Sequence, residues 1–268
     1  SRMEQSEIIQ EIPALVLKNL IDRSYDKRKA AAGEIESIVH QMHDAFLPSP
    51  LLLDAGDTER IRKIIRVLTD TIQQDVNSNS IKGGLIGLAS CGIGVGTDII
   101  NYISFLLPPI LDCFDNEDTR IRFYACESLY NIVKAARGGI LTFINEIFSS
   151  LCELYADVDV EVKEISCIAT AYTSFTLGRI LLDKLLKEIV TETQSFDVEK
   201  LIPLMEQYIS DTSPHIRRLL ISWIDVMDNV PGIDILDFLP GFLEGLFDML
   251  SDPHREIRQV RVHARHYA

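Results

Sequence analysis

The sequence predicts an all-α protein, a HEAT- or armadillo-like α-solenoid of about six helical hairpins. A short signature recurs along the chain: an acidic turn, then Val or Ile, then Arg or Lys. Apolar residues on both sides of this turn recur at helical spacing, and the strict alternation of a half-buried strand is absent. Aromatic residues make up only 7% of the 268 residues, so Leu, Ile, Val and Ala must fill the core. Such a composition favours helices over a β-sandwich.

The basic residue that closes each signature sets the period of the repeat. Three of the five intervals between these residues are about 40 residues, inside the range of HEAT and armadillo repeats. The other two intervals are longer by about 13 residues, so each predicts an insertion into a repeat of that class. The closing residues are Arg28, Lys82, Arg122, Lys163, Arg217 and Arg258.

The first two repeats are expected after residues 1–11, which we interpret as a disordered tail or a cloning remnant. The first turn is atypical, because Lys27 stands where the other copies carry an apolar residue. Two prolines and a glycine then predict an insertion near residues 44–58. The turn of the second repeat lacks its Asp, and we expect the glycines of segment 82–90 to allow close helix packing.

The third repeat shows the hairpin most clearly. Apolar residues recur at helical spacing over 106–114, before the turn, and over 121–133, after it. An acidic residue at the turn can accept the free N–H groups that open the second helix.

The fourth repeat is followed by an apolar, Thr-rich insertion near residues 164–180, which we expect either to lengthen a helix or to form a packed loop. The fifth and sixth turns follow without insertions. Residues 259–268 are too short for a full helix, so we interpret them as an atypical or truncated segment. Residues 12–258 are therefore assigned to the solenoid.

The charges of the turns have a structural explanation. Each hairpin is apolar on a stripe too wide to be stable alone, so neighbouring hairpins must stack to bury it. Stacking brings successive turns together, and we expect Asp157, Asp211, Arg217 and Asp252 to take part in a ladder of charged pairs along one edge. Exposed pairs of this kind contribute only about 0–1 kcal/mol each.

No motif predicts catalysis, and we expect no enzyme, no cofactor and no metal site. The glycines of segment 92–96 lack the Lys-Ser/Thr of a phosphate-binding loop and a preceding strand. His40 and His43, like His263 and His266, have ligand-like spacing but no Glu or Cys partner in a metal motif. The five cysteines include no Cys-x-x-Cys pair, and we interpret them as buried free thiols of a reducing compartment.

Charge and composition favour a protein-binding function. The net charge of −14 argues against a nucleic-acid partner, because such binding requires positive surface. A basic group in the first two repeats and a Tyr- and Arg-containing helix in the third stand out, although a solvated helix face or part-buried tyrosines would explain them structurally. Second helices line the binding groove of many solenoids. The predicted partner-binding residues are Lys27, Arg28, Lys29, Lys82, Arg122, Tyr124, Tyr130, Lys134 and Arg137.

Several stretches of the chain carry a resemblance to one family: YDKRKAAAGEIE at 25–36, KGGLIGLA at 82–89, RIRFYACESLYNIVKAARG at 120–138, LLDKLLKEIVTE at 181–192, ISWI at 221–224 and NVPGIDILDFLP at 229–240. The family that they resemble is the N-terminal HEAT-repeat region of the scaffold subunit of the PIKfyve complex. The resemblance implies a non-catalytic scaffold whose N-terminal repeats bind a phosphatidylinositol 3-phosphate 5-kinase. It also implies a Sac-type lipid phosphatase as a partner of the full-length scaffold, control of phosphatidylinositol 3,5-bisphosphate, and a peripheral position on the cytosolic face of endosomal or vacuolar/lysosomal membranes.

Two other binding functions stay open at this stage. One is a different protein-binding HEAT array, a transport adaptor or a tubulin-binding protein. The acidic turns and the single Trp within a helix argue against tubulin. The other is a membrane-surface binder that uses the basic face of the first two repeats. Each exposed Lys or Arg there could add about 1 kcal/mol at an anionic membrane.

Overall fold

The computed structural model describes residues 11–44, 55–74, 77–156, 169–193, 196–230 and 232–258. Every regular element among them is helical, so the all-α prediction is confirmed. The chain divides into two compact units. Unit 1 comprises residues 1–140 and 170–178, and unit 2 comprises residues 141–169 and 179–268.

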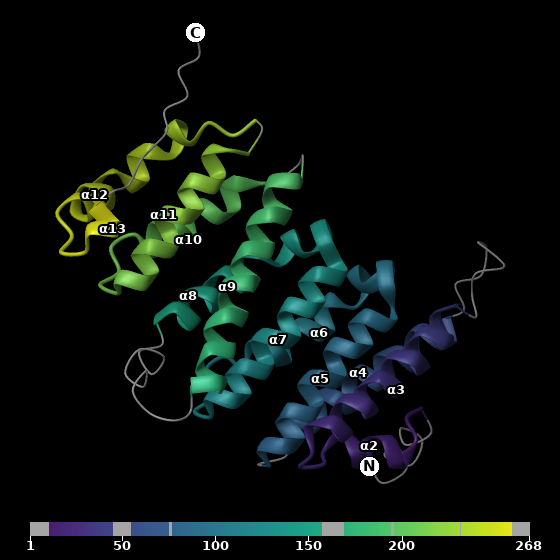
Figure 1. Ribbon diagram of the computed structural model, residues 1–268. Coiled ribbons are helices and arrows are strands. Elements are labelled where there is room, and N and C mark those ends of the chain that lie inside the picture. The colour runs from purple at the N-terminus through teal and green to yellow at the C-terminus, as the bar shows by residue number, and fades with distance from the viewer. Residues whose placement is uncertain are drawn as a thin grey trace. The chain divides into compact units, whose positions relative to one another are not determined.

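Unit 1 contains three successive helical hairpins (Figure 1). Their second helices pack side by side in the order α3, α5, α7, and each first helix packs on its own second helix. This stacking is the arrangement that the repeat period predicts. The elements are α2 (Ala14–Leu20) with α3 (Tyr25–Asp44), α4 (Ala55–Gln73) with α5 (Ser78–Gly94), and α6 (Ile103–Leu111) with α7 (Thr119–Ala136), plus the 3₁₀ helices η1 (Gly96–Asn101) and η2 (Arg137–Phe143), the latter extending into unit 2.

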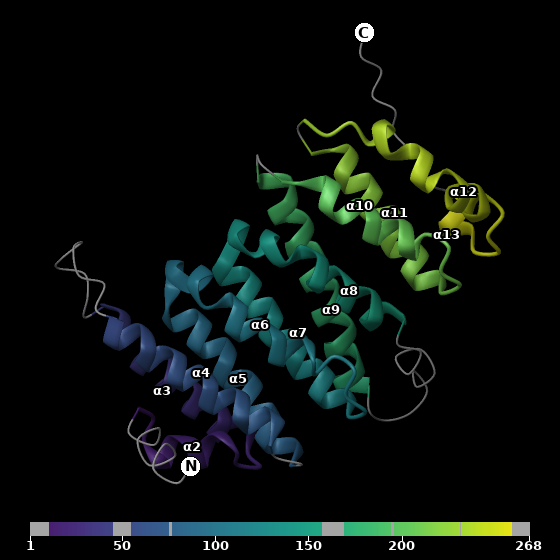
Figure 2. The ribbon, with the colours of Figure 1, turned by 180° about the vertical axis from the view of Figure 1, so that it is seen from behind.

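Unit 2 continues the pattern, with α8 packing on α10 and α11 packing on both (Figure 2). Its single Trp223 is fully buried and meets Phe148 edge to face at 5.2 Å between ring centroids. The Trp223 indole N–H donates to Asp183 at 2.8 Å. The elements are α8 (Ile144–Ala156), α9 (Ala169–Glu192), α10 (Val198–Tyr208), α11 (Pro214–Asp228), η4 (Ile235–Phe238), α12 (Leu239–Leu250) and α13 (Arg255–Arg258). Residues 170–178 of α9 belong to unit 1.

Helices extend into both of the segments in which insertions are predicted. Helix α3 extends to Asp44 and α4 begins at Ala55, so both ends of the first insertion are helical. Helix α9 begins at Ala169 and occupies most of the second insertion, which favours the alternative of a lengthened helix. Residues 1–10, 45–54, 157–168 and 259–268, and with them the fourth turn, lie outside the described residues.

The glycines of α5 let this helix approach its neighbours closely, as the sequence predicts. A Cβ atom on Gly83 would collide with the backbone carbonyl oxygen of Leu20 in α2. A Cβ on Gly94 would lie 2.7 Å from the carbonyl oxygen of Glu36 in α3. Backbone atoms cannot move aside as a flexible side chain can, so glycine is required at these crossings.

The repeat signature has one local geometry in four turns. The side-chain oxygen of the first turn residue accepts the N–H two residues later, as Asp211 does from Ser213 at 2.7 Å. The closing Arg, six residues after the first turn residue, donates to the backbone carbonyls that open the turn. Arg28, Arg122, Arg217 and Arg258 each make this pair of bonds, and Asp22, Asn116, Asp211 and Asp252 each accept the N–H.

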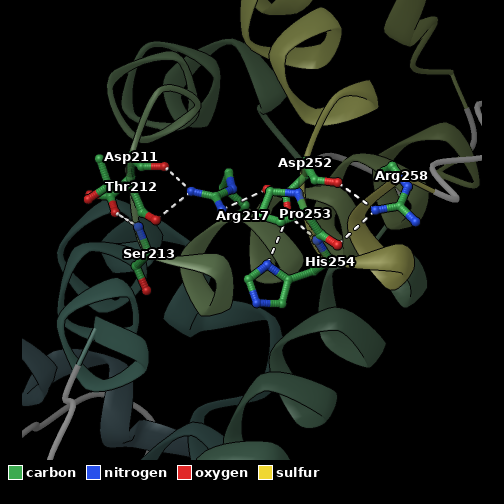
Figure 3. A network of polar contacts seen from close by, with 8 residues as sticks. All are labelled: Asp211, Thr212, Ser213, Arg217, Asp252, Pro253, His254 and Arg258. Atoms are coloured by element: carbon green, nitrogen blue, oxygen red, sulfur yellow. Dashed lines mark hydrogen bonds and ion pairs between the residues drawn. The ribbon is translucent and has the colours of Figure 1, made fainter.

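Neighbouring turns are also joined, as the predicted ladder requires. Lys82 reaches forward to Asp118 of the next turn, with Nζ 3.5 Å from Oδ2. Arg217 contacts Asp252 of the next turn at 2.6 Å, which Figure 3 shows in the centre of the network. The ladder is thus confirmed for these two pairs, and Asp157 lies outside the described residues. Burial alone would raise the pKa of Asp252, but hydrogen bonds from the backbone and ring of His254 and from Arg217 hold it below its ordinary value.

Candidate partner-binding surface

Three of the predicted binding residues have a structural role that their sequence position conceals. The side chains of Arg28, Lys82 and Arg122 are buried, with 4%, 6% and 7% of their surface exposed. Arg28 and Arg122 donate to carbonyls of their own turns, and Lys82 contacts Asp118. These residues stabilise the turns, because moving their charged groups toward a partner would break the bonds they already make.

The exposed part of the predicted surface follows one stripe of α7. Four residues, Phe123, Glu127, Tyr130 and Lys134, recur at spacings of three and four, which place them on one face of α7, and Arg137 follows as the residue that caps the helix. We call this set the α7 stripe. Its first three members are half-buried, whereas Lys134 and Arg137 are exposed. The stripe therefore grades from an aromatic end near the turn to a basic end at the end of the helix.

A second group, the α3 cluster, adjoins the aromatic end of the stripe. It comprises Tyr25, Arg28, Lys29 and Tyr124. The Arg28 guanidinium lies 5.7 Å from the centroid of the Tyr124 ring and donates to the Tyr124 hydroxyl at 3.1 Å. Residues of the first and third repeats are therefore in direct contact across the second.

Aromatic rings extend the α3 cluster toward solvent. Tyr25 and Tyr124 have centroids 6.4 Å apart, and the Lys29 ammonium lies 6.0 Å from the Tyr25 ring. Partial burial raises the pKa of Tyr25. Lys27, by contrast, is exposed and pairs with Asp22 of its own turn at 3.0 Å. Exposed cations beside tyrosines form a composition typical of binding hot spots.

Sequence reasoning missed three members of this surface, Tyr25, Phe123 and Glu127. Phe123 and Glu127 could have been found by stepping back from Tyr130 by three and then four residues along the helix. Tyr25 could not, because only the folded chain brings α3 against α7. Burial raises the pKa of Glu127, and the nearby Lys29 opposes that rise.

Arg137 ends α7 in an unusual backbone conformation. Its φ is +49° and its ψ is −132°, and it is the only residue other than glycine with a positive φ in the described chain. Its backbone N–H still caps the helix, because it donates a hydrogen bond to the Val133 carbonyl oxygen. Gly138 and Gly139 follow, and a Cβ on Gly139 would lie 3.0 Å from Ile100 of η1.

The basic residues of α4 are partly engaged within the fold. Arg60 donates to Glu11 at 2.7 Å. The Arg62 guanidinium lies 5.3 Å from the centroid of the Phe105 ring in α6. The second contact joins the first helices of neighbouring repeats, and both contacts make the group less available to a membrane surface than its sequence suggests.

The described residues hold no cluster of three or more His, Cys, Asp or Glu side chains that could bind a metal ion. Cys91, Cys113, Cys126 and Cys152 are buried free thiols, as predicted, and Cys167 lies outside the described residues. Burial raises the pKa of Cys91 to about 12, which disfavours a reactive thiolate. Within the described ranges, we find no helix long and apolar enough to cross a bilayer.

The chain matches known proteins along almost its whole length. Residues 79–188 match a family described as the Vacuolar 14 Fab1-binding region. The chain is 42% identical over 254 residues to "Protein VAC14 homolog" of Arabidopsis thaliana, a match that covers 95% of this chain and 31% of that protein. The resemblance inferred from the sequence is thereby confirmed.

Two fungal relatives give the same result. Identity is 33% over 284 residues to "Protein VAC14 homolog" of Schizosaccharomyces pombe, covering 92% of this chain and 32% of that protein. It is 35% over 288 residues to "Vacuole morphology and inheritance protein 14" of Saccharomyces cerevisiae, covering 91% and 30%. The chain spans about a third of the length of these relatives. The α7 stripe lies inside the matched residues 79–188, whereas Tyr25, Arg28 and Lys29 precede them.

Proposed function

We propose that the chain is the kinase-binding part of a helical-repeat scaffold, because residues 79–188 match the family described as the Vacuolar 14 Fab1-binding region. Its partner is a Fab1-type lipid kinase of the PIKfyve class. The chain contributes surface and geometry to the complex and no catalytic group. The observation that carries the proposal is the match of this region to a Fab1-binding family, on the residues that present the α7 stripe.

The arrangement of the α7 stripe supports this function. Half-buried aromatic rings next to exposed cations offer apolar area and charge together, the combination that dominates binding energy at protein interfaces. The stripe lies on a second helix whose position is fixed by packing against α5 and α6. A rigid surface loses little conformational entropy when a partner docks.

The wider function that we propose is assembly. The full-length scaffold also holds a Sac-type lipid phosphatase, and the complex controls phosphatidylinositol 3,5-bisphosphate on the cytosolic face of endosomal or vacuolar membranes. Tethering two enzymes on one scaffold raises the effective concentration of each enzyme near the other. This chain takes part through its kinase-binding repeats, and its attachment to the membrane is peripheral, through the complex.

A pull-down of the Fab1-type kinase by the purified 268-residue chain tests the proposal. We expect retention of the kinase, and we expect Lys134→Glu to weaken it because Lys134 is exposed inside the matched region. Lys18→Glu is the matched control, since Lys18 is exposed on α2 and lies outside that region. Circular dichroism establishes that each variant is folded. A folded wild-type chain that retains no kinase would contradict the proposed function.

A further inference from the structure

The backbone of Arg137 is held in a conformation that favours glycine. With φ at +49° and ψ at −132°, the Cβ of an L-residue is crowded by its own backbone. The strain is local, because helix α7 ends here and the chain turns directly into η2. A glycine at this position would relieve the strain, and the next two residues, Gly138 and Gly139, are glycines.

The Arg137 side chain makes no contact within the described fold that would compensate for this strain. It is exposed, and it makes no hydrogen bond or ion pair with another residue in the described ranges. The same holds for Lys134, three residues earlier on the same stripe. In contrast, the repeat-closing arginines Arg28, Arg122 and Arg217 are buried or half-buried and all bond to turn carbonyls. Residues held in strained conformations cluster at binding and active sites, where the strain positions a side chain for a ligand.

We propose that Arg137 and Lys134 form a docking point for an acidic segment of the kinase, with the strained backbone of Arg137 positioning its guanidinium. This inference rests on the proposed function, and it names the part of the α7 stripe and the chemistry that recognise the partner. The segment carries Asp or Glu side chains, because a guanidinium binds a carboxylate through two parallel hydrogen bonds.

The surrounding charge supports an anionic ligand at this point. The chain as a whole carries a net charge of −14, yet Lys134 and Arg137 are both exposed and only three residues apart. Both cations lie at the C-terminal end of α7, where the helix dipole stabilises them in the unbound protein. An approaching carboxylate would therefore meet two cations that no described side chain neutralises.

Three substitutions at one position separate strain from recognition. Arg137→Gly removes both the strain and the guanidinium, so we expect its melting temperature to rise by a few degrees while kinase affinity falls about tenfold or more. Arg137→Ala keeps a Cβ and therefore the strain, so we expect the same loss of affinity without the gain in stability. Arg137→Lys keeps the charge but loses the two parallel donors of the guanidinium, so its affinity should lie between those of the wild-type chain and Arg137→Ala. Binding is measured with purified kinase by biolayer interferometry, at two salt concentrations.

The outcomes discriminate between the claims. A loss of affinity in the Gly and Ala variants, together with a weaker salt dependence than that of the wild-type chain, supports the docking point. Wild-type affinity in both variants overturns it while leaving the proposed function intact. A wild-type chain that does not bind the kinase overturns the proposed function, and the inference with it. Normal kinase binding combined with lost binding to phosphatidylserine-containing vesicles would assign the two cations to a membrane and would also overturn the inference.

Discussion

Arg217 and Asp252, which belong to the turns of two successive repeats, form an ion pair with 2.6 Å between Nη2 and Oδ2. Arg217 also donates to two carbonyls of its own turn, and Asp252 also accepts from the N–H of His254 (Figure 3). Each residue therefore stabilises its own turn and contacts its neighbour. The pair links the local geometry of the turn to the stacking of the hairpins, which explains why the signature recurs at the period of the repeat.

The first prediction concerns this link. Asp252→Asn keeps the shape of the side chain but removes the charge that faces Arg217, so we expect a melting temperature several degrees lower. Asp248→Asn, at an exposed position of α12, is the control and should leave it nearly unchanged. Fluorescence of Trp223, the single Trp and a core residue of unit 2, is the measurement, since it reports on this unit. Equal melting temperatures for both variants would remove the pair from the stabilising contacts.

The second prediction concerns acid. The pKa values of Asp118 and Asp252 lie below the ordinary value, although burial opposes this, because both carboxylates accept several hydrogen bonds. A lowered pKa contributes stability that is complete above about pH 3.9, the ordinary value, and is lost as the pH falls through the folded-state value. Urea midpoints should therefore drop below about pH 4. The difference between wild type and Asp252→Asn should shrink over the same interval, and a difference that grows with acid would contradict this account.

The Glu127 carboxyl changes stability with pH in the opposite direction. Burial raises its pKa, so the folded chain is destabilised once the pH exceeds the ordinary value of a Glu and this side chain must ionise. Glu127→Gln should therefore raise the melting temperature at pH 7 and have little effect at pH 4, where the carboxyl is largely protonated in the folded chain. Scanning calorimetry at the two pH values measures this. A variant less stable than wild type at pH 7 would show that Lys29 outweighs burial.

The sequence predicted the repeat and its helices, because both depend on local periodicity. The signature located four turns of one geometry, and the ladder of charges followed from stacking alone. Local periodicity did not reveal that α4 begins at Ala55 and so includes Gly56, inside a segment marked by Pro and Gly.

The candidate surface differs from the predicted set of binding residues for a physical reason. A basic residue has the same sequence signal whether it is exposed, like Lys134, or buried over turn carbonyls, like Arg122. The distinction depends on position within the signature. Contacts between repeats, such as Tyr25 with Tyr124, join residues far apart in the chain, so periodicity does not reveal them. Nor does sequence predict that Arg137, rather than a glycine, carries a positive φ.

A pair of glycines tests the packing of α5. Gly83→Ala places a methyl group against the Leu20 backbone carbonyl, so the helices must separate, and we expect a loss of about 1–3 kcal/mol in the free energy of unfolding. Gly33→Ala is the matched variant, because nothing lies within 4 Å of the added Cβ in α3. It should gain about 0.4–1 kcal/mol. Urea titrations followed by circular dichroism measure the free energy of unfolding of both variants. A change of the same sign in the two would refute the explanation that Gly83 is required for the close approach of α5 to α2.

The last prediction concerns the contact between the first and third repeats. Tyr124→Phe removes the hydroxyl that accepts from Arg28 but keeps the ring against the guanidinium. We expect a loss of about 0.5–1.5 kcal/mol in the free energy of unfolding. Tyr130→Phe, on the same helix, removes a hydroxyl with no partner in the described ranges, so it should change stability little.

Kinase affinity should distinguish the two tyrosine variants, which keep it, from variants at the basic end of the stripe, which lose it. If the hydroxyl of Tyr124 serves the fold, its removal lowers stability while leaving kinase affinity within about twofold, well inside the effect of one lost hydrogen bond. Interferometry at a temperature where both variants are folded measures this. A large loss of affinity in Tyr124→Phe without a loss of stability would mean that the hydroxyl contacts the kinase and that Arg28 releases it on binding. The docking point at Lys134 and Arg137 would then extend along the stripe to the α3 cluster.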